Sequence, residues 1–402
     1  MHRIRIAVLL SPLKLYVFAA IPVIIWGYLL LARGGFWRVS RHLSRRPADS
    51  NSKGSVVAIV PARNEATVIG AAVKSLLQQS FSGVIRVIVV DDGSTDGTGA
   101  LAIQAASSIG AAAKLMVVAA PPPPSDWSGK LWAMSCGVAA ARPLEPEYLL
   151  FTDADIVHEP DNVAALVAMA HSRSYELVSY MVRLSTQSVA EQCLIPAFVF
   201  FFFKLYPPAW VESAHSTLAG AAGGCILIRP QTLARVGGLE AIRSEIIDDC
   251  ALATLVKSSG GTIWLGLTRT ARSTRRYDSF AEIGRMISRT AFNQLGHSYL
   301  LLAVTLLGLF FTYLLPPLLL FSGHTISIAL GGVAWCLMGV SYAPMVRFYG
   351  LSPLWCICLP AIALFYAAAT VHSALRYRLG RGGQWKGRMQ DRPIRGRGGA
   401  AS

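Results

Sequence analysis

The stretch Tyr148-Leu149-Leu150-Phe151-Thr152-Asp153-Ala154-Asp155 places two carboxylates two residues apart, directly after a short apolar run. A short apolar run is typical of a strand buried on both faces of a sheet. Clustered carboxylates repel one another unless a cation lies between them, and their hard oxygen atoms suit Mg²⁺ or Mn²⁺, which can also hold a diphosphate. The pattern therefore predicts Asp153 and Asp155 at a metal and diphosphate site. The alternative is a solvated or capping turn before a helix near Asp161.

The sequence around this stretch alternates between short apolar runs and helical patterns. The runs are Val56–Val60, Ile85–Val90, Leu115–Val118 and Tyr148–Thr152, and the helical patterns are Thr67–Gln79, Thr95–Ser108 and Lys130–Ala141. This alternation predicts an α/β domain with a mainly parallel sheet, in which ligands bind beyond the carboxyl ends of the strands. The residues that follow these strands are therefore the candidates for chemistry.

Polar loops follow the first two predicted strands. Pro61-Ala62-Arg63-Asn64-Glu65 follows the first, and Asp91-Asp92-Gly93-Ser94-Thr95-Asp96 follows the second. Asp, Gly, Ser and Thr are common turn and N-cap residues, so each loop alone is equally well explained as local structure. A third segment, Trp127-Ser128-Gly129-Lys130, opens a helix with a lysine that opposes the helix dipole. That placement favours an anionic ligand near Lys130 over a solvated surface lysine.

The two ends of the chain are far more apolar than its middle. The chain has 402 residues, 53% of them hydrophobic, and a mean hydropathy of +0.47, which is too apolar for an ordinary soluble enzyme. Runs of about the length that spans a bilayer lie at Leu15–Ala32, Tyr299–Phe321, Ile326–Met345 and Leu351–Leu375. We therefore expect a soluble domain tethered by membrane helices.

The predicted organisation has four parts. Residues 1–37 form an uncleaved signal-anchor, 38–298 a cytoplasmic domain, 299–375 transmembrane or re-entrant helices, and 376–402 a basic tail. Arginines after the first run predict a multi-pass protein of the inner (cytoplasmic) membrane with its domain on the cytoplasmic side. Three full spans would put the basic tail outside, against the charge rule. Tyr299–Phe321, with its Pro316-Pro317 break, is therefore a candidate for a re-entrant or interfacial segment, and the number of spans stays open.

The formal net charge of +15 raises the question of the partner. The basic residues border the apolar runs, which favours anionic lipid headgroups over nucleic acid. They are Arg33, Arg38, Arg41, Arg45, Arg46 and Lys53 after the first run, and Arg376, Arg378, Arg381, Lys386, Arg388, Arg392, Arg395 and Arg397 after the last. The seven cysteines form no CxxC pair, so we expect neither a zinc site nor a disulfide framework.

The ordered motifs between about Val56 and Arg289 resemble the family 2 inverting glycosyltransferases, which have the GT-A nucleotide-sugar fold. By this resemblance, Asp92 with its neighbour Asp91 binds the nucleotide base, and the Pro61–Glu65 loop lines the same pocket. The resemblance also implies that Asp155 binds the metal, that Asp153 faces the diphosphate or sugar and assists at the metal, and that Lys130 neutralises phosphate charge.

The acceptor side of this family is matched further along the chain. Gly223–Arg229 resembles its glycine-rich strand, and Glu245–Leu252 resembles its catalytic-base motif, with Asp-Asp in place of the usual Glu-Asp. An inverting transfer needs a base for the acceptor hydroxyl, and a carboxylate beside another has a reason to be a stronger base. Asp249 is the candidate base and Asp248 the second choice. Alternatively, both acids only stabilise a helix N-terminus.

This sequence departs from the family pattern at Arg285–Thr290. At the corresponding place, the membrane members of the family carry Gln or Arg, followed by any two residues and then by Arg-Trp. The resemblance implies a diphosphate-binding role for Arg289, but it gives no match for the acceptor-side aromatic. The missing tryptophan argues against a processive polysaccharide synthase. The Asp-Asp-Cys-Ala-Leu and Arg-Thr-Ala-Phe stretches, with Gln384–Arg388 in the tail, most resemble the hopanoid-associated glycosyltransferases, which are related in outline to ceramide glucosyltransferases. This implies a nucleotide-sugar donor, a UDP-sugar first, and a membrane lipid acceptor.

The run Leu194–Phe203 is strongly aromatic and too short to span a membrane. Lys, Tyr and Trp within Lys204–Trp210 have the character of headgroup-level anchors. We therefore predict an interfacial segment that guides a lipid acceptor toward Asp249, with a buried core helix as the alternative.

Three other functional classes remain to be weighed. A non-catalytic membrane scaffold is disfavoured by the intact acids, and a nucleotidyltransferase by the lack of glycine in Pro61–Glu65. A transporter is disfavoured by the scarcity of charge inside the C-terminal runs. A synthase of a surface polysaccharide stays as an alternative to the lipid-directed enzyme.

Overall fold

The computed structural model describes residues 12–42, 54–380, 384–385 and 388–389. The chain divides into two units. The helical unit comprises residues 1–41, 186–207 and 277–379, and the sheet unit comprises 42–185, 208–276 and 380–402. The domain boundaries predicted at 37, 298 and 375 stay a prediction. Of the predicted basic clusters, Arg45, Arg46, Lys53, Arg381, Lys386, Arg392, Arg395 and Arg397 lie outside the described residues.

The sheet unit is built on one mixed sheet with the strand order β3-β2-β1-β4-β7-β6-β8-β5. Its strands are β1 (Ser55–Ala62), β2 (Val84–Asp91), β3 (Leu115–Ala119), β4 (Tyr148–Thr152), β5 (Ile156–His158), β6 (Leu177–Arg183), β7 (Cys225–Ile228) and β8 (Ile263–Ser273). The first four are parallel, whereas β7 runs antiparallel to both of its neighbours. All four predicted strands are confirmed, and β4 has the predicted bounds.

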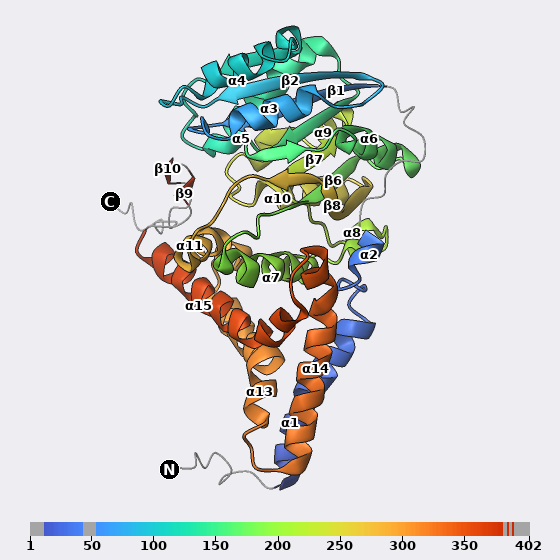
Figure 1. Cartoon of the computed structure of the whole chain (residues 1–402), viewed down its shortest axis with the longest axis vertical. Helices are drawn as coiled ribbons and strands as arrows, with labels where there is room; N and C mark the ends of the chain where they lie inside the picture. The colour runs from blue at the N-terminus through green and yellow to red at the C-terminus, as the bar shows by residue number, and fades with distance from the viewer. Residues whose placement is uncertain (1–11, 43–53, 381–383, 386–387, 390–402) are drawn as a thin grey trace, which may run out of the picture. The chain divides into compact units, whose positions relative to one another are not determined.

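Helices cover both faces of this sheet. On one face, α3 (Ile69–Leu77), α4 (Thr98–Ser107) and α6 (Asn162–Ser172) pack against alternate residues of β1, beginning with Val56 and Ala58 (Figure 1). On the other face lies α5 (Gly129–Ala141), and it comes so close that a Cβ on Gly137 would be 2.4 Å from Ile59 Cγ2. Burial on both faces explains why these strands are almost wholly apolar.

The remaining elements of the sheet unit are short. They are α8 (Pro208–Glu212), α9 (Pro230–Arg235), α10 (Asp248–Ser258), the strand pair β9 (Gln384–Trp385) and β10 (Arg388–Met389), and 3₁₀ turns at Ala112–Lys114, Arg142–Leu144 and Leu239–Ile242. Ala62 at the end of β1 pairs in register with Asp91 at the end of β2, and β4 ends beside them at Thr152. The polar loops therefore leave the sheet at one common edge.

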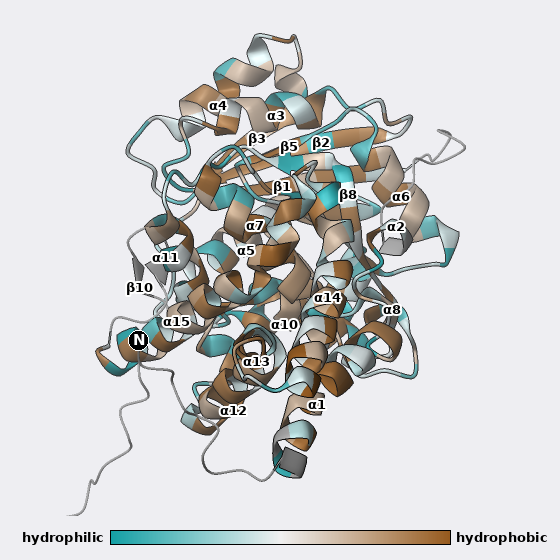
Figure 2. Cartoon of the chain, turned by 60° about the horizontal axis from the view of Figure 1, so that its bottom comes forward, coloured by the Kyte–Doolittle hydropathy of each residue, from teal (hydrophilic) through white to brown (hydrophobic). Residues whose placement is uncertain are grey.

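The helical unit contains the long apolar helices. Its elements are α1 (Pro12–Leu31), most of α2 (Val39–His42), α7 (Val189–Leu205), α11 (Phe280–Thr290), a 3₁₀ turn (Asn293–Leu295), α12 (Tyr299–Leu309), a π-helical turn (Phe310–Leu314), α13 (Leu315–Leu319), α14 (Thr325–Phe348), a 3₁₀ turn (Pro353–Cys358) and α15 (Leu359–Arg378). Hydrophobic colours dominate its helices in Figure 2. Among the described residues, four helical stretches are long and apolar enough to cross a membrane, namely Val189–Glu212, Tyr299–Leu319, Thr325–Phe348 and Pro353–Arg378. The first predicted run lies on α1, which contains the apolar stretch Tyr16–Leu31.

Two expectations about these helices are wrong. The run Leu194–Phe203 is not too short to span, because it lies within the 24-residue helical stretch Val189–Glu212. The double proline Pro316-Pro317 does not break the chain, because helical structure continues from Tyr299 to Leu319. Both prolines lie in the first turn of α13, directly after the π-helical turn Phe310–Leu314, and such local adjustments let a helix continue through proline.

The aromatic run on α7 packs into the core of the helical unit. Phe200 and Phe203 are each 1% exposed, and the Phe200 ring lies 5.3 Å from Phe36 and 5.2 Å from Tyr342, measured between ring centroids. The core alternative is therefore confirmed for these two side chains, while Phe202 and Leu205 stay accessible to solvent or lipid.

Candidate active site

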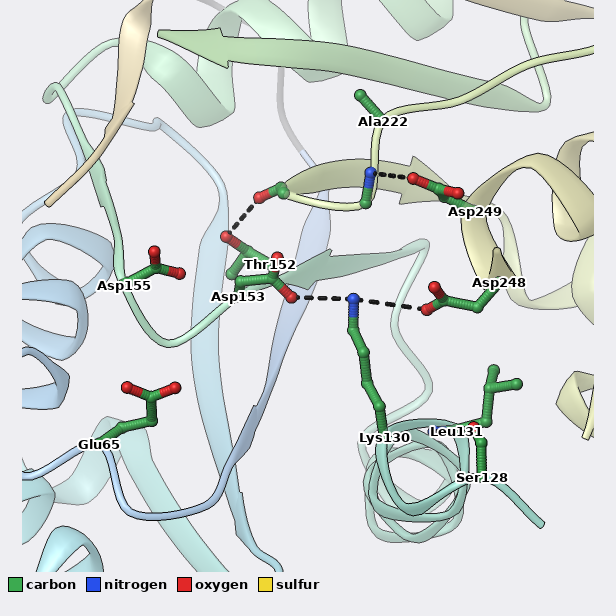
Figure 3. Close-up of polar contacts among 12 residues, drawn as sticks. Glu65, Ser128, Lys130, Leu131, Thr152, Asp153, Asp155, Ala222, Asp248 and Asp249 are labelled. Atoms are coloured by element: carbon green, nitrogen blue, oxygen red, sulfur yellow. Dashed lines mark hydrogen bonds and ion pairs between the residues drawn. The ribbon is translucent and has the colours of Figure 1, made fainter. Parts of the chain in front are cut away.

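Lys130 joins the strand-end acids to the acids of α10. Ser128 caps α5 by accepting a hydrogen bond from the Leu131 N–H, which sets Lys130 in the first helical turn. Its Nζ lies 3.0 Å from Asp153 Oδ1 and 3.4 Å from Asp248 Oδ2 (Figure 3). The predicted residues Lys130, Asp153 and Asp248 therefore share one site, although they come from three segments of the chain.

The charges in this cluster depend on one another. Burial disfavours the lysine cation, but the nearby carboxylates of Asp153, Asp248 and Asp249 outweigh it and raise the pKa of Lys130. Burial raises the pKa of Asp153, the cation of Lys130 opposes that shift, and the charge on Asp155 adds to it. Lys130 therefore stays charged and stabilises the anionic forms of the acids around it.

Asp249 is held as an oriented carboxylate. Its Oδ2 accepts a 2.7 Å hydrogen bond from the Gly223 N–H, and its Oδ1 accepts one of 2.8 Å from the Cys250 N–H. Burial, followed by the charge of Asp248, raises the pKa of Asp249 to about 6, against the opposing effect of Lys130. A group with this pKa is well matched to proton transfer near neutral pH.

Gly223 leaves room for this arrangement. A Cβ at that position would lie 3.2 Å from Asp249 Oδ2 and 3.4 Å from Lys130 Nζ, which is tighter than ordinary side-chain contact. The glycine of the predicted acceptor-side strand therefore allows the backbone N–H to approach the acid, and it sits just before β7.

Asp155 lies at the same edge of the sheet but has a different cation as its partner. Its Oδ2 accepts hydrogen bonds from Ser273 Oγ at 2.8 Å and from Arg275 Nε at 3.1 Å. Arg275 Nη2 also donates to Glu65 Oε1 at 2.9 Å, so one guanidinium bridges two predicted site residues. The sequence reasoning missed Ser273 and Arg275, although both stand at the end of a strand, in the polar run Arg272–Arg276.

The loops after β1 and β2 are bonded together. Asn64 N–H donates to Ser94 Oγ, Thr95 N–H donates to Asn64 Oδ1, and Glu65 N–H donates to Thr98 Oγ1, at 2.9 to 3.0 Å. Asn64 has a φ of 52°, which places it in the left-handed region. The two loops therefore form one wall of the site.

The predicted base-binding residues lie in this wall. Asp92 is 1% exposed, and its Oδ2 lies 3.4 Å from Arg63 Nη1. Asp91 accepts a hydrogen bond from the Ser94 N–H at 2.8 Å, while Pro61 and Ala62 are the last residues of β1. Asp91 thus has the local turn role that its residue type allows, and Asp92 is the buried carboxyl group.

A divalent metal is compatible with this donor set, but only together with a ligand. Within the described residues, no three His, Cys, Asp or Glu side chains gather closely enough to hold a metal by themselves. Asp153 and Asp155 follow one strand and offer hard carboxylate oxygens. Mg²⁺ is commonly bound by one or two carboxylates together with substrate phosphates, and this set fits that arrangement.

One predicted residue belongs to the other unit. Arg289 lies on α11 of the helical unit, in the last turn of that helix. Its contact with a diphosphate stays a prediction. The departure at Thr290 from the Arg-Trp pattern falls on the same helix.

A buried hydrogen-bond chain supports the turn that orients Asp249. Asn162 Oδ1 accepts a hydrogen bond from Thr270 Oγ1, which turns the amide nitrogen toward His158. Asn162 Nδ2 therefore donates to His158 Nδ1 at 2.8 Å. His158 Nε2 then donates to Thr152 Oγ1 at 3.0 Å, and Thr152 donates to the Gly224 carbonyl at 2.9 Å. Burial lowers the pKa of His158 to about 4. The imidazole is therefore neutral, with one nitrogen that accepts from Asn162 and one that donates to Thr152.

Thr152→Val is expected to remove the link between His158 and the Gly224 carbonyl while keeping the side-chain shape. Leaving buried groups without their partner costs about 1–3 kcal/mol of folding free energy. We also expect kcat to fall while the KM for the donor stays near its parent value, because the turn orients the base rather than the donor. Thermal unfolding and steady-state kinetics measure the two effects. A changed donor KM with an unchanged kcat would contradict this assignment.

Comparison with known proteins agrees with this geometry. Residues 57–229 match the family model described as glycosyl transferase family 2. No curated protein matches the sequence. The mannosyltransferase PcManGT from Pyrobaculum calidifontis, solved with GDP-Man and Mn²⁺, has 18% identity and a TM-score of 0.54, with 90% of this chain and 99% of that chain covered.

A second solved structure is more distant. Glucosyl-3-phosphoglycerate synthase from Mycobacterium tuberculosis, in complex with Mn²⁺, UDP and glucosyl-3-phosphoglycerate, has 18% identity and a TM-score of 0.41, with 63% of this chain and 86% of that chain covered. The family match and the fold of PcManGT identify a glycosyltransferase family 2 domain with the GT-A fold. The glycosyltransferase assignment therefore applies to the domain around residues 57–229.

Proposed function

We propose that this glycosyltransferase moves a sugar, with inversion, from a nucleotide-diphosphate-sugar to the hydroxyl of a membrane lipid of the hopanoid or sphingolipid class. Asp249 takes the proton from the acceptor hydroxyl as that oxygen forms its bond to the sugar. The bond between the sugar and the diphosphate breaks in the same displacement, and the nucleoside diphosphate leaves with the electron pair. Asp248 assists by holding Lys130.

The observation that carries this proposal is the position of Lys130 between Asp153 and Asp248. It brings the strand-end carboxylates and the acids of α10 into one site, in which Asp249 is the oriented carboxylate of raised pKa. A general base needs a suitable pKa and a fixed direction, and both are present at Asp249.

The proposed metal is Mg²⁺ or Mn²⁺ at Asp155, with Asp153 beside it. When bound, it would neutralise the charge that develops on the departing diphosphate. The loops at Pro61–Glu65 and Asp91–Asp92 would form the wall that holds the nucleotide. A uridine nucleotide is the first candidate. PcManGT was crystallised with GDP-Man and Mn²⁺, which supports a metal-dependent nucleotide-sugar site of this class.

A lipid acceptor is supported by the four helical stretches that are long and apolar enough to cross a membrane. Arg33 and Arg38 follow α1, and Arg376 and Arg378 lie in the last turn of α15. Cations at helix ends suit the anionic headgroups of a cytoplasmic leaflet. We propose that the sheet unit faces the cytoplasm at the inner membrane, with the basic residues on that side.

The test is a transfer assay on the purified full chain in lipid nanodiscs made from a total lipid extract. A panel of radiolabelled UDP- and GDP-sugars is added with Mn²⁺, and the lipids are extracted and separated. We expect label from one sugar to move into the lipid fraction, and no label with the Asp249→Asn variant. Label that enters water-soluble polymer instead would favour the polysaccharide synthase, and no transfer with any donor would count against enzymatic activity.

A further inference from the structure

Arg275 is placed where a metal-binding carboxylate would need a cation. It follows β8, whose last residue Ser273 pairs with Ile156 beside Asp155. The Thr274 N–H and hydroxyl both donate to the Asp155 carbonyl, at 2.8 and 3.0 Å. The segment Ser273–Arg275 thus wraps around Asp155, and its guanidinium reaches both Asp155 Oδ2 and Glu65 Oε1.

The three members of this bridge differ in exposure. The side chains of Asp155 and Glu65 are 11% and 12% exposed, whereas that of Arg275 is 39% exposed. The acids are therefore fixed in the wall of the site, and the guanidinium reaches them from its accessible side. A long flexible side chain on the accessible side can leave without disturbing the strands that hold the acids.

A divalent ion at Asp155 and the guanidinium on the same carboxylate would repel each other, because both carry positive charge. The metal therefore competes with Arg275 for Asp155. Once displaced, the guanidinium remains within reach of the same edge of the sheet, and its planar fork of N–H donors matches phosphate oxygens. A diphosphate that arrives with the metal supplies those oxygens.

We propose that Arg275 neutralises Asp155 in the ligand-free enzyme and moves onto the donor diphosphate when the metal enters. This inference rests on the proposed function, since it assumes a nucleotide-diphosphate donor at this site. Metal binding and donor binding are then coupled through one side chain. The coupling is reciprocal, so the metal strengthens donor binding and the donor strengthens metal binding by the same factor.

The experiment compares the parent with Arg275→Gln in the purified full chain. Free Mn²⁺ is measured by electron paramagnetic resonance without nucleotide, and UDP and GDP binding is measured by calorimetry with and without Mn²⁺. Without nucleotide, Arg275→Gln is expected to bind Mn²⁺ about tenfold more tightly, because its competitor is gone. With saturating Mn²⁺, the variant is expected to bind the nucleoside diphosphate about tenfold more weakly, and without Mn²⁺ equally well.

The matched control is Arg276→Gln, which changes the exposed neighbouring arginine and should leave both affinities unchanged. Arg275→Lys keeps the positive charge but lacks the planar fork of N–H donors that contacts Asp155 and Glu65 together, so its Mn²⁺ affinity should fall between those of the parent and Arg275→Gln. Thermal unfolding checks that each variant is folded. If Arg275→Gln does not fold, the Lys variant carries the comparison.

Several results would overturn the proposal. An unchanged or weaker Mn²⁺ affinity in Arg275→Gln, including no detectable binding in either protein, would show that Arg275 does not compete for Asp155. Equal losses of nucleotide binding with and without Mn²⁺ would indicate a purely structural bridge. A parent protein that binds neither UDP nor GDP would instead refute the proposed function, and the Mn²⁺ titration would still report on Arg275.

Discussion

Asp249→Asn is expected to lower kcat by about 10²- to 10⁴-fold, which is the usual contribution of a positioned general base. The asparagine keeps an oxygen that can accept from the Gly223 N–H, so the loop geometry should survive. Donor binding should change little, because the base acts on the acceptor in the transition state. Single-turnover transfer and calorimetric binding of the nucleoside diphosphate separate the two quantities.

The pH dependence gives an independent check on the same residue. The pKa of Asp249 is raised to about 6, so the carboxyl is protonated below that pH and cannot take a proton. The parent rate should therefore fall about tenfold for each pH unit on the acid side of pH 6. The acid limb should be missing from the residual activity of Asp249→Asn.

Asp248→Asn is the matched comparison, because it removes the neighbouring acid and keeps the candidate base. Asp248 lies 3.4 Å from Lys130 Nζ, so we expect a smaller loss of rate for this variant. Turnover of Asp249→Asn within tenfold of the parent would rule out Asp249 as the base. Inactivity of Asp248→Asn alone would mean that the two acids have exchanged roles.

Removal of the metal is the second large expected effect. Metal stabilisation of transition-state charge is worth several kcal/mol, so excess EDTA is expected to lower transfer by at least about 10³-fold. Asp155→Ala is expected to give a similar loss and to abolish the Mn²⁺-dependent part of nucleotide binding. Restoring Mn²⁺ should rescue the EDTA-treated parent but not the variant.

Glu159→Ala is a suitable control for Asp155→Ala, since it removes an exposed acid four residues away, at the other end of β5. Its transfer rate and Mn²⁺-dependent nucleotide binding should match those of the parent. Full activity of the parent in excess EDTA would refute the metal requirement. Unchanged Mn²⁺ dependence in Asp155→Ala would place the metal elsewhere.

Local sequence patterns predicted the strands, their order along the chain and the loops that carry the chemistry. The run Tyr148–Thr152 has the predicted bounds, and helix α5 begins within one residue of the predicted Lys130. These features are readable because burial on both faces requires uninterrupted apolar strands, and because polar residues gather where parallel strands end. The resemblance built on those loops anticipated the family 2 domain at residues 57–229.

Sequence patterns failed in two places, where the length of an apolar run and the presence of two prolines were judged without the adjoining helical turns. The aromatic run Leu194–Phe203 was judged by its own length, but α7, which contains it, runs from Val189 to Leu205, and α8 follows at Pro208–Glu212 within the same apolar stretch. The prolines at 316 and 317 were taken as a break, yet the helical stretch continues through them to Leu319, with a π-helical turn directly before α13. In both cases the neighbouring turns of helix, which a hydropathy run does not show, decided the outcome.

The sequence by itself determined the α/β domain, the apolar helices and the residue types at each strand end. Only the tertiary structure decided which charges meet: Lys130 with Asp153 and Asp248, and Arg275 with Asp155, 120 residues earlier, and with Glu65. The spacing of apolar residues along a helix or strand indicates which side chains face the core, because that spacing involves only neighbours in sequence. The pairing of charges depends on strand order and on distances of about 3 Å, which the packing of the whole sheet sets.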